Sequence, residues 1–385
     1  MLSFMPPGGV VQCIYRDTSG CSHVRLRWNS AFLAGVAEAA GITPILLPNP
    51  IIDGNWLAGT RAIFWQRPIS DQDLNLLTNL KAHQPKFNYK LVGEFDDLCW
   101  VSHGEFIPPY NMASLNMQNV EGMQKNVARA LSLLDEVIVS TEWLKKSIED
   151  TFDYHSVTVV KNVVPRYLWS WDRKPDITED IKVPTVLYSG APQHYRNPVP
   201  KCPQFPNGVE PMPGDWSQAW IDFIIKNVME HKINFVIMGA LPYFFEPIKD
   251  MITFIPWVDC NSFPREVMKI KADFMIAPLA ENEFNRCKSD LRFLEACATS
   301  AVFLGSYWPN SPYEGIHPDC RITKDASITF IQEKFDALKK KEKWNEVKNW
   351  QSEYLNRTGR WLESNNHTNQ LLSAFDNTQV GKQFM

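Results

Sequence analysis

Two short apolar runs with a helical segment between them constrain the fold of this 385-residue chain more than any other feature. Residues 272–279 (ADFMIAPL) and 301–306 (AVFLGS) have the length of buried strands, and residues 291–300 (LRFLEACATS) have helical spacing. A strand, a helix and a second strand in this order form a βαβ unit, and such units build parallel sheets. The polar loop at residues 280–289 follows the first strand, so we expect it to line a ligand-binding crevice at the carboxyl edge of the sheet.

The predicted helix of this unit carries charged residues beside its apolar stripe. Lys288, Arg292 and Glu295 are four and three positions apart, so they share one helix face. A cation near the helix start and a carboxylate two turns later can together hold a phosphate and a sugar hydroxyl. The alternative is a solvated Arg292–Glu295 pair beside an exposed Lys288, and the spacing alone favours that alternative. The residues predicted to form the buried stripe are Cys287, Leu291, Leu294 and Ala298.

Length and composition predict two globular domains. A chain of 385 residues that is 44% hydrophobic, with 14 Trp and 22 Phe, has enough apolar material for two cores. A linker rich in Pro, Asp and Lys at residues 173–183 separates two alternating α/β patterns, so the predicted domains are residues 1–180 and 181–385. The net charge of −4 gives no electrostatic argument for nucleic acid or acidic lipid as the main partner, although a local basic patch is compatible with it.

The sequence has neither the pattern of a secretory signal nor that of a membrane-spanning helix. The first residues, MLSFMPPGG, lack a charged start and a long apolar core, and no apolar run approaches the ~20 residues that span a bilayer. The eight cysteines form no CxxC pair and no zinc-type spacing, so we expect reduced thiols in the cores. These features together predict a soluble cytoplasmic protein that does not bind membranes.

Short apolar runs alternate with periodic segments along both halves of the chain. In the first half, strands are predicted at residues 2–5, 44–47, 61–65, 87–95, 136–140 and 157–160, with helices at 22–40, 120–134 and 141–147. In the second half, strands at 185–188, 234–238 and 252–255 and helices at 215–230 and 263–271 precede the βαβ unit. A charged helical tail at 328–363 offers Trp344, Trp350 and Trp361 for docking. The Pro-rich stretch that ends at Gly214 is too long for a simple connection, and it predicts a binding loop or lid.

Several short motifs follow one another in an order typical of one enzyme group. They are GEFDDLCW, LLDEVIVSTEWL, the strand that ends at Asn162, Tyr188-Ser189-Gly190, VIMG, FIPWV and IAPLAENEFNRCKSDLRFLEACA. In this order they resemble the GT-B glycosyltransferases, particularly the nucleotide-sugar-dependent group broadly like family 4. The resemblance covers most of the chain. It implies an α/β fold in which two Rossmann-like domains face a central cleft, with a carboxyl-terminal helical segment.

The resemblance also implies a donor site in the second domain. Lys288 and Ser289 would hold the donor diphosphate, and the Glu295 carboxylate would bind the ribose hydroxyls. The donor would be a nucleotide sugar, UDP-linked, and neither a metal nor a further cofactor would be required. The other positions assigned to the donor are Gly190, Arg196, Lys201 and Asn285. The chain departs from the family where retaining members carry a glutamate eight positions before the second one: Cys287 stands there, which leaves the sugar and the stereochemistry open.

Acceptor-side chemistry is assigned to the first domain. A cleft-facing carboxylate of the Asp96-Asp97 pair would be the general base of an inverting reaction, or would orient the acceptor in a retaining one. The alternative is two turn-forming aspartates. His23 and His103 are alternative bases, although a lone loop histidine is more often a surface residue. A basic and aromatic cluster near the acceptor side is either a solvated face or a contact for an anionic acceptor, and it consists of Arg16, Arg25, Arg27 and Trp28.

The acceptor itself is the least determined part of this interpretation. The compact chain is similar to the sugar transferases of large phages that modify hydroxymethylated cytosine in DNA, which implies glucosyl or arabinosyl transfer to that hydroxymethyl group in a host cytoplasm. The acidic net charge argues against DNA, because phosphate contacts need clustered Lys and Arg. The alternatives are a polysaccharide, a protein or a small metabolite as acceptor, or a non-catalytic nucleotide- or sugar-binding protein that kept the fold.

Overall fold

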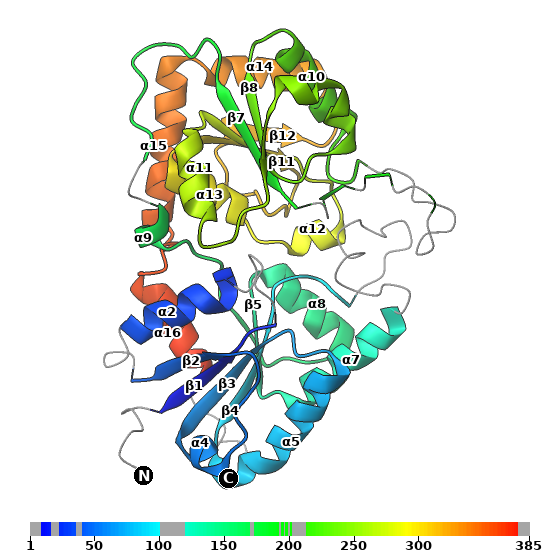
Figure 1. Cartoon of the computed structure of the whole chain (residues 1–385), viewed down its shortest axis with the longest axis vertical. Helices are drawn as coiled ribbons and strands as arrows, with labels where there is room; N and C mark the ends of the chain where they lie inside the picture. The colour runs from blue at the N-terminus through cyan, green and yellow to red at the C-terminus, as the bar shows by residue number, and fades with distance from the viewer. Residues whose placement is uncertain are drawn as a thin grey trace.

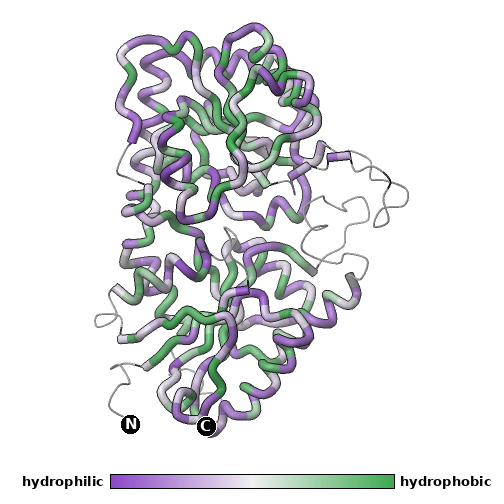
Figure 2. The backbone as a smooth tube through the Cα atoms, viewed as in Figure 1, coloured by the Kyte–Doolittle hydropathy of each residue, from purple (hydrophilic) through white to green (hydrophobic). Residues whose placement is uncertain are grey.

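The computed structural model describes residues 9–16, 23–35, 41–100, 120–169, 173–191, 194–195, 197–198, 201 and 213–375. The predicted strand at residues 2–5 lies outside these residues, as does most of the Pro-rich stretch before Gly214. Figure 1 shows two α/β domains stacked along the long axis of the molecule. Each domain has its own hydrophobic strands at the centre, as Figure 2 shows.

The first domain is built on a six-stranded parallel sheet with the order β2-β1-β3-β4-β5-β6. Because every strand pair is parallel, all carboxyl ends lie at one edge of the sheet. The strands are β1 (Val10–Ile14), β2 (Thr43–Leu47), β3 (Thr60–Gln66), β4 (Lys90–Phe95), β5 (Glu136–Val139) and β6 (Val157–Val159). The helical elements are η1 (His23–Arg27), α2 (Trp28–Gly35), α4 (Gly54–Gly59), α5 (Asp71–Phe87), α7 (Val120–Leu133) and α8 (Glu142–Phe152).

The second domain repeats this architecture with the strand order β12-β11-β10-β7-β8-β9, again all parallel. The strands are β7 (Thr185–Gly190), β8 (Asn234–Gly239), β9 (Thr253–Pro256), β10 (Phe274–Ala277), β11 (Val302–Tyr307) and β12 (Arg321–Thr323). The helical elements are α9 (Arg166–Trp169), α10 (Gln218–Met229), η4 (Tyr243–Met251), α11 (Phe263–Ile270), α12 (Glu283–Cys287), α13 (Leu291–Thr299), η5 (Pro318–Cys320), α14 (Ile328–Leu338), α15 (Lys341–Arg357) and α16 (Asn365–Ala374).

The βαβ unit predicted from the sequence is present, with one refinement. Strands β10 and β11 pair directly in parallel, with Phe274 opposite Val302. The connection contains two helices instead of one, because Asn282 accepts a hydrogen bond from the Asn285 N–H and begins the short helix α12. Cys287 therefore belongs to α12 and not to the stripe of α13.

The cores of the two domains exchange elements at their boundary. Trp169 of α9 is buried in the core of the second domain, although its sequence position falls within the predicted first domain. At the other end of the chain, α16 returns to the first domain, where Leu371, Ala374 and Phe375 pack with strand residues such as Phe64. The two domains are therefore tied together at both the linker and the carboxyl-terminal tail.

Several helical elements differ from the sequence-based prediction; α4 and η4, for example, were not predicted. The helix predicted at residues 22–40 begins as a π-helical turn, η1, and continues as α2; residues 36–40 lie outside the described part. Helix α5 was missed. It has a capping box between Ser70 and Asp73, and it buries Leu74, Leu77 and Leu80.

Within the described residues, no helix combines the length and the apolar character that crossing a bilayer would need. The cysteines described there are thiols, and all except the half-buried Cys260 are buried.

Candidate active site at the boundary between the domains

Residues 287–290, which run from the end of α12 to the start of α13, contact the carboxyl edge of the first domain. The Thr141 hydroxyl, just beyond β5, donates to the Cys287 carbonyl oxygen at 2.9 Å. The Asn162 side-chain amide, just beyond β6, donates to the Ser289 hydroxyl at 2.7 Å. The residues that follow parallel strands in both domains thus meet, so the two carboxyl edges face each other. We call residues 287–290 the boundary segment.

The boundary segment also brings together two residues that were predicted to act in different domains. The Lys288 ammonium lies 3.9 Å from the Asp97 carboxylate, and their side chains are 22% and 30% exposed. Lys288 also lies 4.7 Å from the centre of the Phe284 ring. Burial raises the pKa of Asp97, Lys288 lowers it, and the neighbouring Asp96 carboxylate raises it again. A partly exposed carboxylate with a raised pKa beside a cation is suited to accept a proton.

The two adjacent aspartates occupy different environments. Asp96 is buried, and its carboxylate lies 3.6 Å from the Arg67 guanidinium. Arg67 adopts a left-handed backbone conformation with φ of 42°, directly after β3. A non-glycine residue in this region costs about 1 kcal/mol, and such strain is often found at functional sites. Asp97 is therefore the better placed of the two to reach a substrate, and Asp96 with Arg67 forms its support.

The proposed ribose ligand, Glu295, is a buried residue of α13. Its carboxylate is 3.3 Å from the Arg292 guanidinium, and Arg292 in turn donates to the Ser189 hydroxyl at 2.5 Å. Burial raises the pKa of Glu295, and Arg292 lowers it. Ser189 and Gly190 end strand β7, so this cluster lies at the carboxyl edge of the second sheet. The pair that the sequence-based alternative predicted is present, but that alternative is wrong in placing the carboxylate in solvent, because the Glu295 side chain is only 7% exposed.

Close backbone packing marks the same edge of the sheet. Gly190 pairs with Gly239 at the ends of β7 and β8. Gly239 has φ of +113°, and a Cβ atom there would lie 2.4 Å from the Gly190 carbonyl oxygen. Only glycine fits at position 239. This approach leaves the strand ends without side chains, which suits a surface that receives a ligand.

Asn285, also predicted to bind the donor, is an internal support. It is fully buried, and its side-chain amide donates to the Asp215 carboxylate at 2.7 Å and to the Ala280 carbonyl oxygen at 2.9 Å. Asp215 further accepts from the Ala280 N–H and from the His194 ring. These bonds fix the loop after β10 against residues that follow β7. Asn285 thus shapes the donor-side loop from within.

The arginines predicted to contact the acceptor make internal contacts. Arg25 is buried, with 3% of its side chain exposed; it pairs with Glu94 at 2.7 Å and donates to Val160 and Asn162. Arg16 forms an ion pair with Asp73 and lies over the Trp65 ring. Arg27 lies over the Tyr15 ring at 4.3 Å. The Arg25 guanidinium is fully engaged in these internal contacts and is not available to an acceptor, whereas Arg16 and Arg27 are only partly buried.

The remaining predicted site residues are distributed as follows. His23 is buried beside Trp28, with ring centres 6.4 Å apart. Lys201 is exposed, and no contact places it at the boundary. His103 and Arg196 lie outside the described residues.

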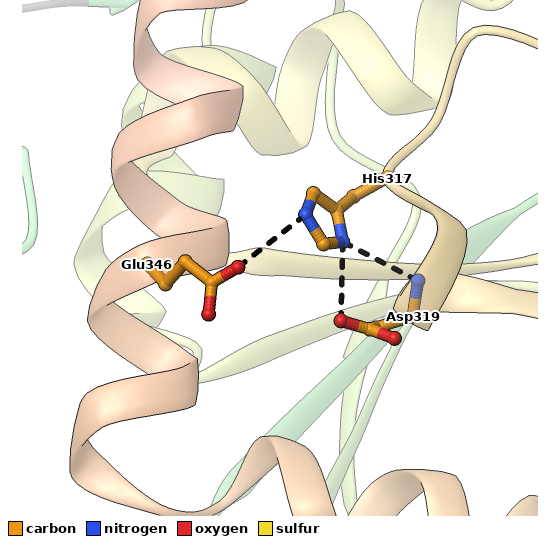
Figure 3. Close-up of side chains that lie close together, drawn as sticks. All are labelled: His317, Asp319 and Glu346. Carbon is orange, nitrogen blue, oxygen red and sulfur yellow. Dashed lines mark hydrogen bonds and ion pairs between the residues drawn. The ribbon is translucent and has the colours of Figure 1, made fainter.

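The described residues contain one group of three side chains with metal-ligand chemistry, and it lies away from the boundary segment. His317 points one ring nitrogen at Asp319 (3.6 Å) and the other at Glu346 (3.9 Å), as Figure 3 shows. Lys343 pairs with both carboxylates, at 2.7 and 2.9 Å. Because a lysine already neutralises the carboxylates and they face opposite ring nitrogens, the group is better described as an ion-pair network that joins η5 to α15.

Comparisons with known proteins support the fold. No protein-family model and no curated protein sequence matches the chain. Among solved structures, a glycosyltransferase from Rickettsia africae ESF-5 matches with a TM-score of 0.57 and 11% identity, over 95% of this chain and 97% of that one. The DNA-modifying enzyme β-glucosyltransferase matches with a TM-score of 0.50 and 13% identity, over 95% and 98%.

TarM matches with a TM-score of 0.51 and 10% identity, and the match covers 90% of this chain and 57% of the TarM chain. The predicted fold class is confirmed: the chain has the two-domain GT-B fold of glycosyltransferases. Identities this low establish the fold alone.

Proposed function

We propose that the protein transfers a sugar from a nucleotide sugar, with UDP as the nucleotide, to a hydroxyl acceptor at the boundary between its domains. One observation carries the proposal. Lys288 was assigned to the donor diphosphate and Asp97 to the acceptor, from motifs almost 200 positions apart, and their charged atoms lie 3.9 Å apart. A reaction between donor and acceptor requires this proximity.

The donor side of the site combines cations with a carboxylate. Lys288 and Arg292 supply positive charge where the diphosphate would lie, and the Ser289 hydroxyl adds a hydrogen-bond donor at the start of α13. Glu295, held by Arg292, would accept hydrogen bonds from the ribose hydroxyls. A departing nucleoside diphosphate gains negative charge as the sugar leaves, and fixed cations at a helix start stabilise it in the transition state.

The acceptor side supplies the base. In an inverting reaction, Asp97 takes the proton of the acceptor hydroxyl while the oxygen of that hydroxyl forms a bond to the anomeric carbon. The bond between that carbon and the diphosphate breaks, and its electron pair stays on the diphosphate oxygen. The raised pKa of Asp97 makes it a better proton acceptor than an ordinary aspartate. In a retaining reaction the same carboxylate would orient the acceptor.

For the acceptor we propose the hydroxymethyl group of a modified cytosine in DNA. The likeness in fold to a DNA-modifying β-glucosyltransferase supports this choice. Of the basic cluster assigned to the acceptor, Arg16 and Arg27 are the partly buried members, and Arg25 is excluded from that role by its buried ion pair. A flipped base would need to enter the boundary near Asp97.

The test has two readouts, one with DNA and one without it. The protein is incubated with hydroxymethylated DNA and a panel of UDP-sugars; mass spectrometry then measures the nucleosides, and free UDP is quantified without DNA. We expect a hexose or pentose mass gain on hydroxymethyl-2′-deoxycytidine and slow hydrolysis of the UDP-sugar to free UDP, both lost in Asp97→Asn. UDP release without a mass gain would reject DNA as acceptor, and the absence of both with every donor would favour a non-catalytic binding protein.

A further inference from the structure

A histidine and a buried aspartate that the sequence interpretation did not use lie on the donor side of the site. The His194 Nδ1 is 2.7 Å from the Asp215 carboxylate, whose side chain is inaccessible to solvent, whereas the His194 side chain is 22% exposed. The Asp215 N–H donates back to the His194 carbonyl oxygen at 2.9 Å. The two residues therefore hold each other through both side chain and backbone.

The local backbone is built for this pair. Gly214 has φ of +64°, and a Cβ atom there would lie 2.2 Å from the His194 carbonyl oxygen. Any other residue at position 214 would push the His194 backbone away. The second Asp215 oxygen accepts from the Ala280 N–H at 3.1 Å and from the Asn285 amide at 2.7 Å. The aspartate is thus fixed independently of the histidine.

The hydrogen bond determines which ring nitrogen carries a proton. A carboxylate only accepts, so Nδ1 is the N–H donor, and any second proton must be added at Nε2. The charges of Lys288 and Arg292 affect the pKa of His194, and His194 in turn affects the pKa of Asp97. Burial lowers the pKa of His194 most, Asp215 raises it, and the two cations lower it. Without a ligand, the ring is therefore neutral near pH 7.

We propose that His194, oriented by Asp215, takes up a proton when the donor diphosphate binds and then donates a hydrogen bond from Nε2 to that diphosphate. The proposal rests on the donor assignment made above and deepens it. A diphosphate diester brings two negative charges beside Lys288 and Arg292, which cancels their repulsion of a third cation. The imidazolium is then paired with Asp215 on one side and with the ligand on the other.

The same arrangement assists the reaction without a proton transfer. When the bond from the anomeric carbon to the diphosphate breaks, its electron pair remains on the diphosphate oxygen. The Nε2–H hydrogen bond stabilises the added charge, because a hydrogen bond from a cation strengthens as its acceptor becomes more negative. Asp215 is a positioning residue, since it acts only through His194.

Isothermal titration calorimetry with UDP-glucose tests this inference, because that ligand does not titrate near neutral pH. Binding is measured near pH 7.5 in two buffers with different ionisation enthalpies, which gives the number of protons taken up. We expect wild type to take up a substantial fraction of one proton, and its affinity to rise as the pH falls, by at most about tenfold per unit. His194→Gln should bind more weakly and take up almost none.

Two further variants separate the alternatives. Asp215→Asn keeps an oxygen for the Ala280 N–H and the Asn285 amide but removes the counter-charge, so it too should lose proton uptake. His155→Gln, an exposed histidine 3.0 Å from Asp153, is the matched control and should behave as wild type. Equal proton uptake in wild type and His194→Gln would overturn this inference alone. Failure of UDP-glucose to bind wild type would overturn the donor assignment and the inference with it.

Discussion

Acidification should release the carboxyl-terminal helix α16 from the first domain through one buried histidine. The His367 Nε2 lies 2.7 Å from the Asn29 side-chain oxygen. The Asn29 amide donates to the backbone oxygens of Val24 and Arg25, so its oxygen is the acceptor and the Nε2 of His367 carries the proton. Burial, followed by the charges of the nearby Arg25 and Arg360, lowers the pKa of His367 from 6.5 to about 3.

The sign and size of the effect follow from these values. In the docked state His367 stays neutral, whereas in the undocked state it takes up a proton below pH 6.5. The docked helix therefore has its full stability above that pH and loses it as the pH falls from 6.5 towards 3. Between pH 7 and pH 5 the undocked state gains a factor of about 25, or about 2 kcal/mol, at 1.36 kcal/mol per pKa unit.

Hydrogen exchange measured by mass spectrometry on peptides from α16 provides the assay. His367→Gln keeps an N–H donor for Asn29 but cannot titrate. At each pH the protection of wild type is divided by that of the variant, which cancels the intrinsic exchange rate and every shared titration. This ratio should fall about 25-fold between pH 7 and pH 5. A ratio that stays constant would refute the reasoning, and His155→Gln should show no pH-dependent difference from wild type.

Three further predictions concern the site and its supports. If Glu295 binds the ribose, wild type should bind UDP about tenfold or more tightly than 2′-deoxy-UDP, and Glu295→Ala should lose that discrimination; equal discrimination in both proteins would place the ribose elsewhere. Asp97→Asn should lower the transfer rate by about 10²-fold or more without weakening UDP binding, because it removes a carboxylate that competes with the diphosphate for Lys288. The acid limb of the wild-type kcat/KM profile should lie above the ordinary aspartate pKa of 3.8, since the raised pKa protonates the base earlier as pH falls. Arg360→Met should lower the free energy of unfolding by about 3 kcal/mol, because it leaves the mostly buried Asp290 without its two hydrogen bonds; denaturant unfolding should show no change in Lys125→Met, which removes an exposed ion pair.

The alternation of apolar runs and periodic helices predicted two α/β halves, and the order of the motifs predicted the GT-B fold. Parallel strands buried on both faces have nearly continuous apolar sequences, and the runs at β4, β5, β10 and β11 are of this kind. Helix α5 shows what such reading misses. Its sequence is mostly polar, and its three buried leucines are spaced three apart. The Ser70–Asp73 capping box is the one sequence signal for its start. The π-helical turn η1 was also not predicted, and its Arg25 makes a buried ion pair with Glu94, which is distant in the sequence.

The candidate site was predictable in its parts and not in its contacts. The positions of Asp97, Lys288 and Glu295 followed from motifs, but a sequence does not show that two charges from different domains lie within 4 Å of each other. Arg25 shows the opposite limit. A basic residue in a basic and aromatic cluster is expected at the surface. Arg25 is buried instead, because it pairs with Glu94, which lies 69 positions away in the sequence. His194 was missed because its partner Asp215 lies across a long Pro-rich stretch.

The boundary segment links donor binding to the acceptor side. The four consecutive residues of the boundary segment contact three residues of the first domain and one of the tail. The partners of the Cys287 carbonyl oxygen, Lys288, Ser289 and Asp290 are Thr141, Asp97, Asn162 and Arg360, in that order. On the proposed assignment, a diphosphate held by Lys288 and Ser289 would compete for two of these contacts, those with Asp97 and Asn162. Because the Lys288 charge lowers the pKa of Asp97, an anion that neutralises Lys288 would raise it. Filling the proposed donor site would therefore make Asp97 a stronger base and loosen its hold on the second domain, so that the base would be most competent when a sugar is in place to receive the acceptor oxygen.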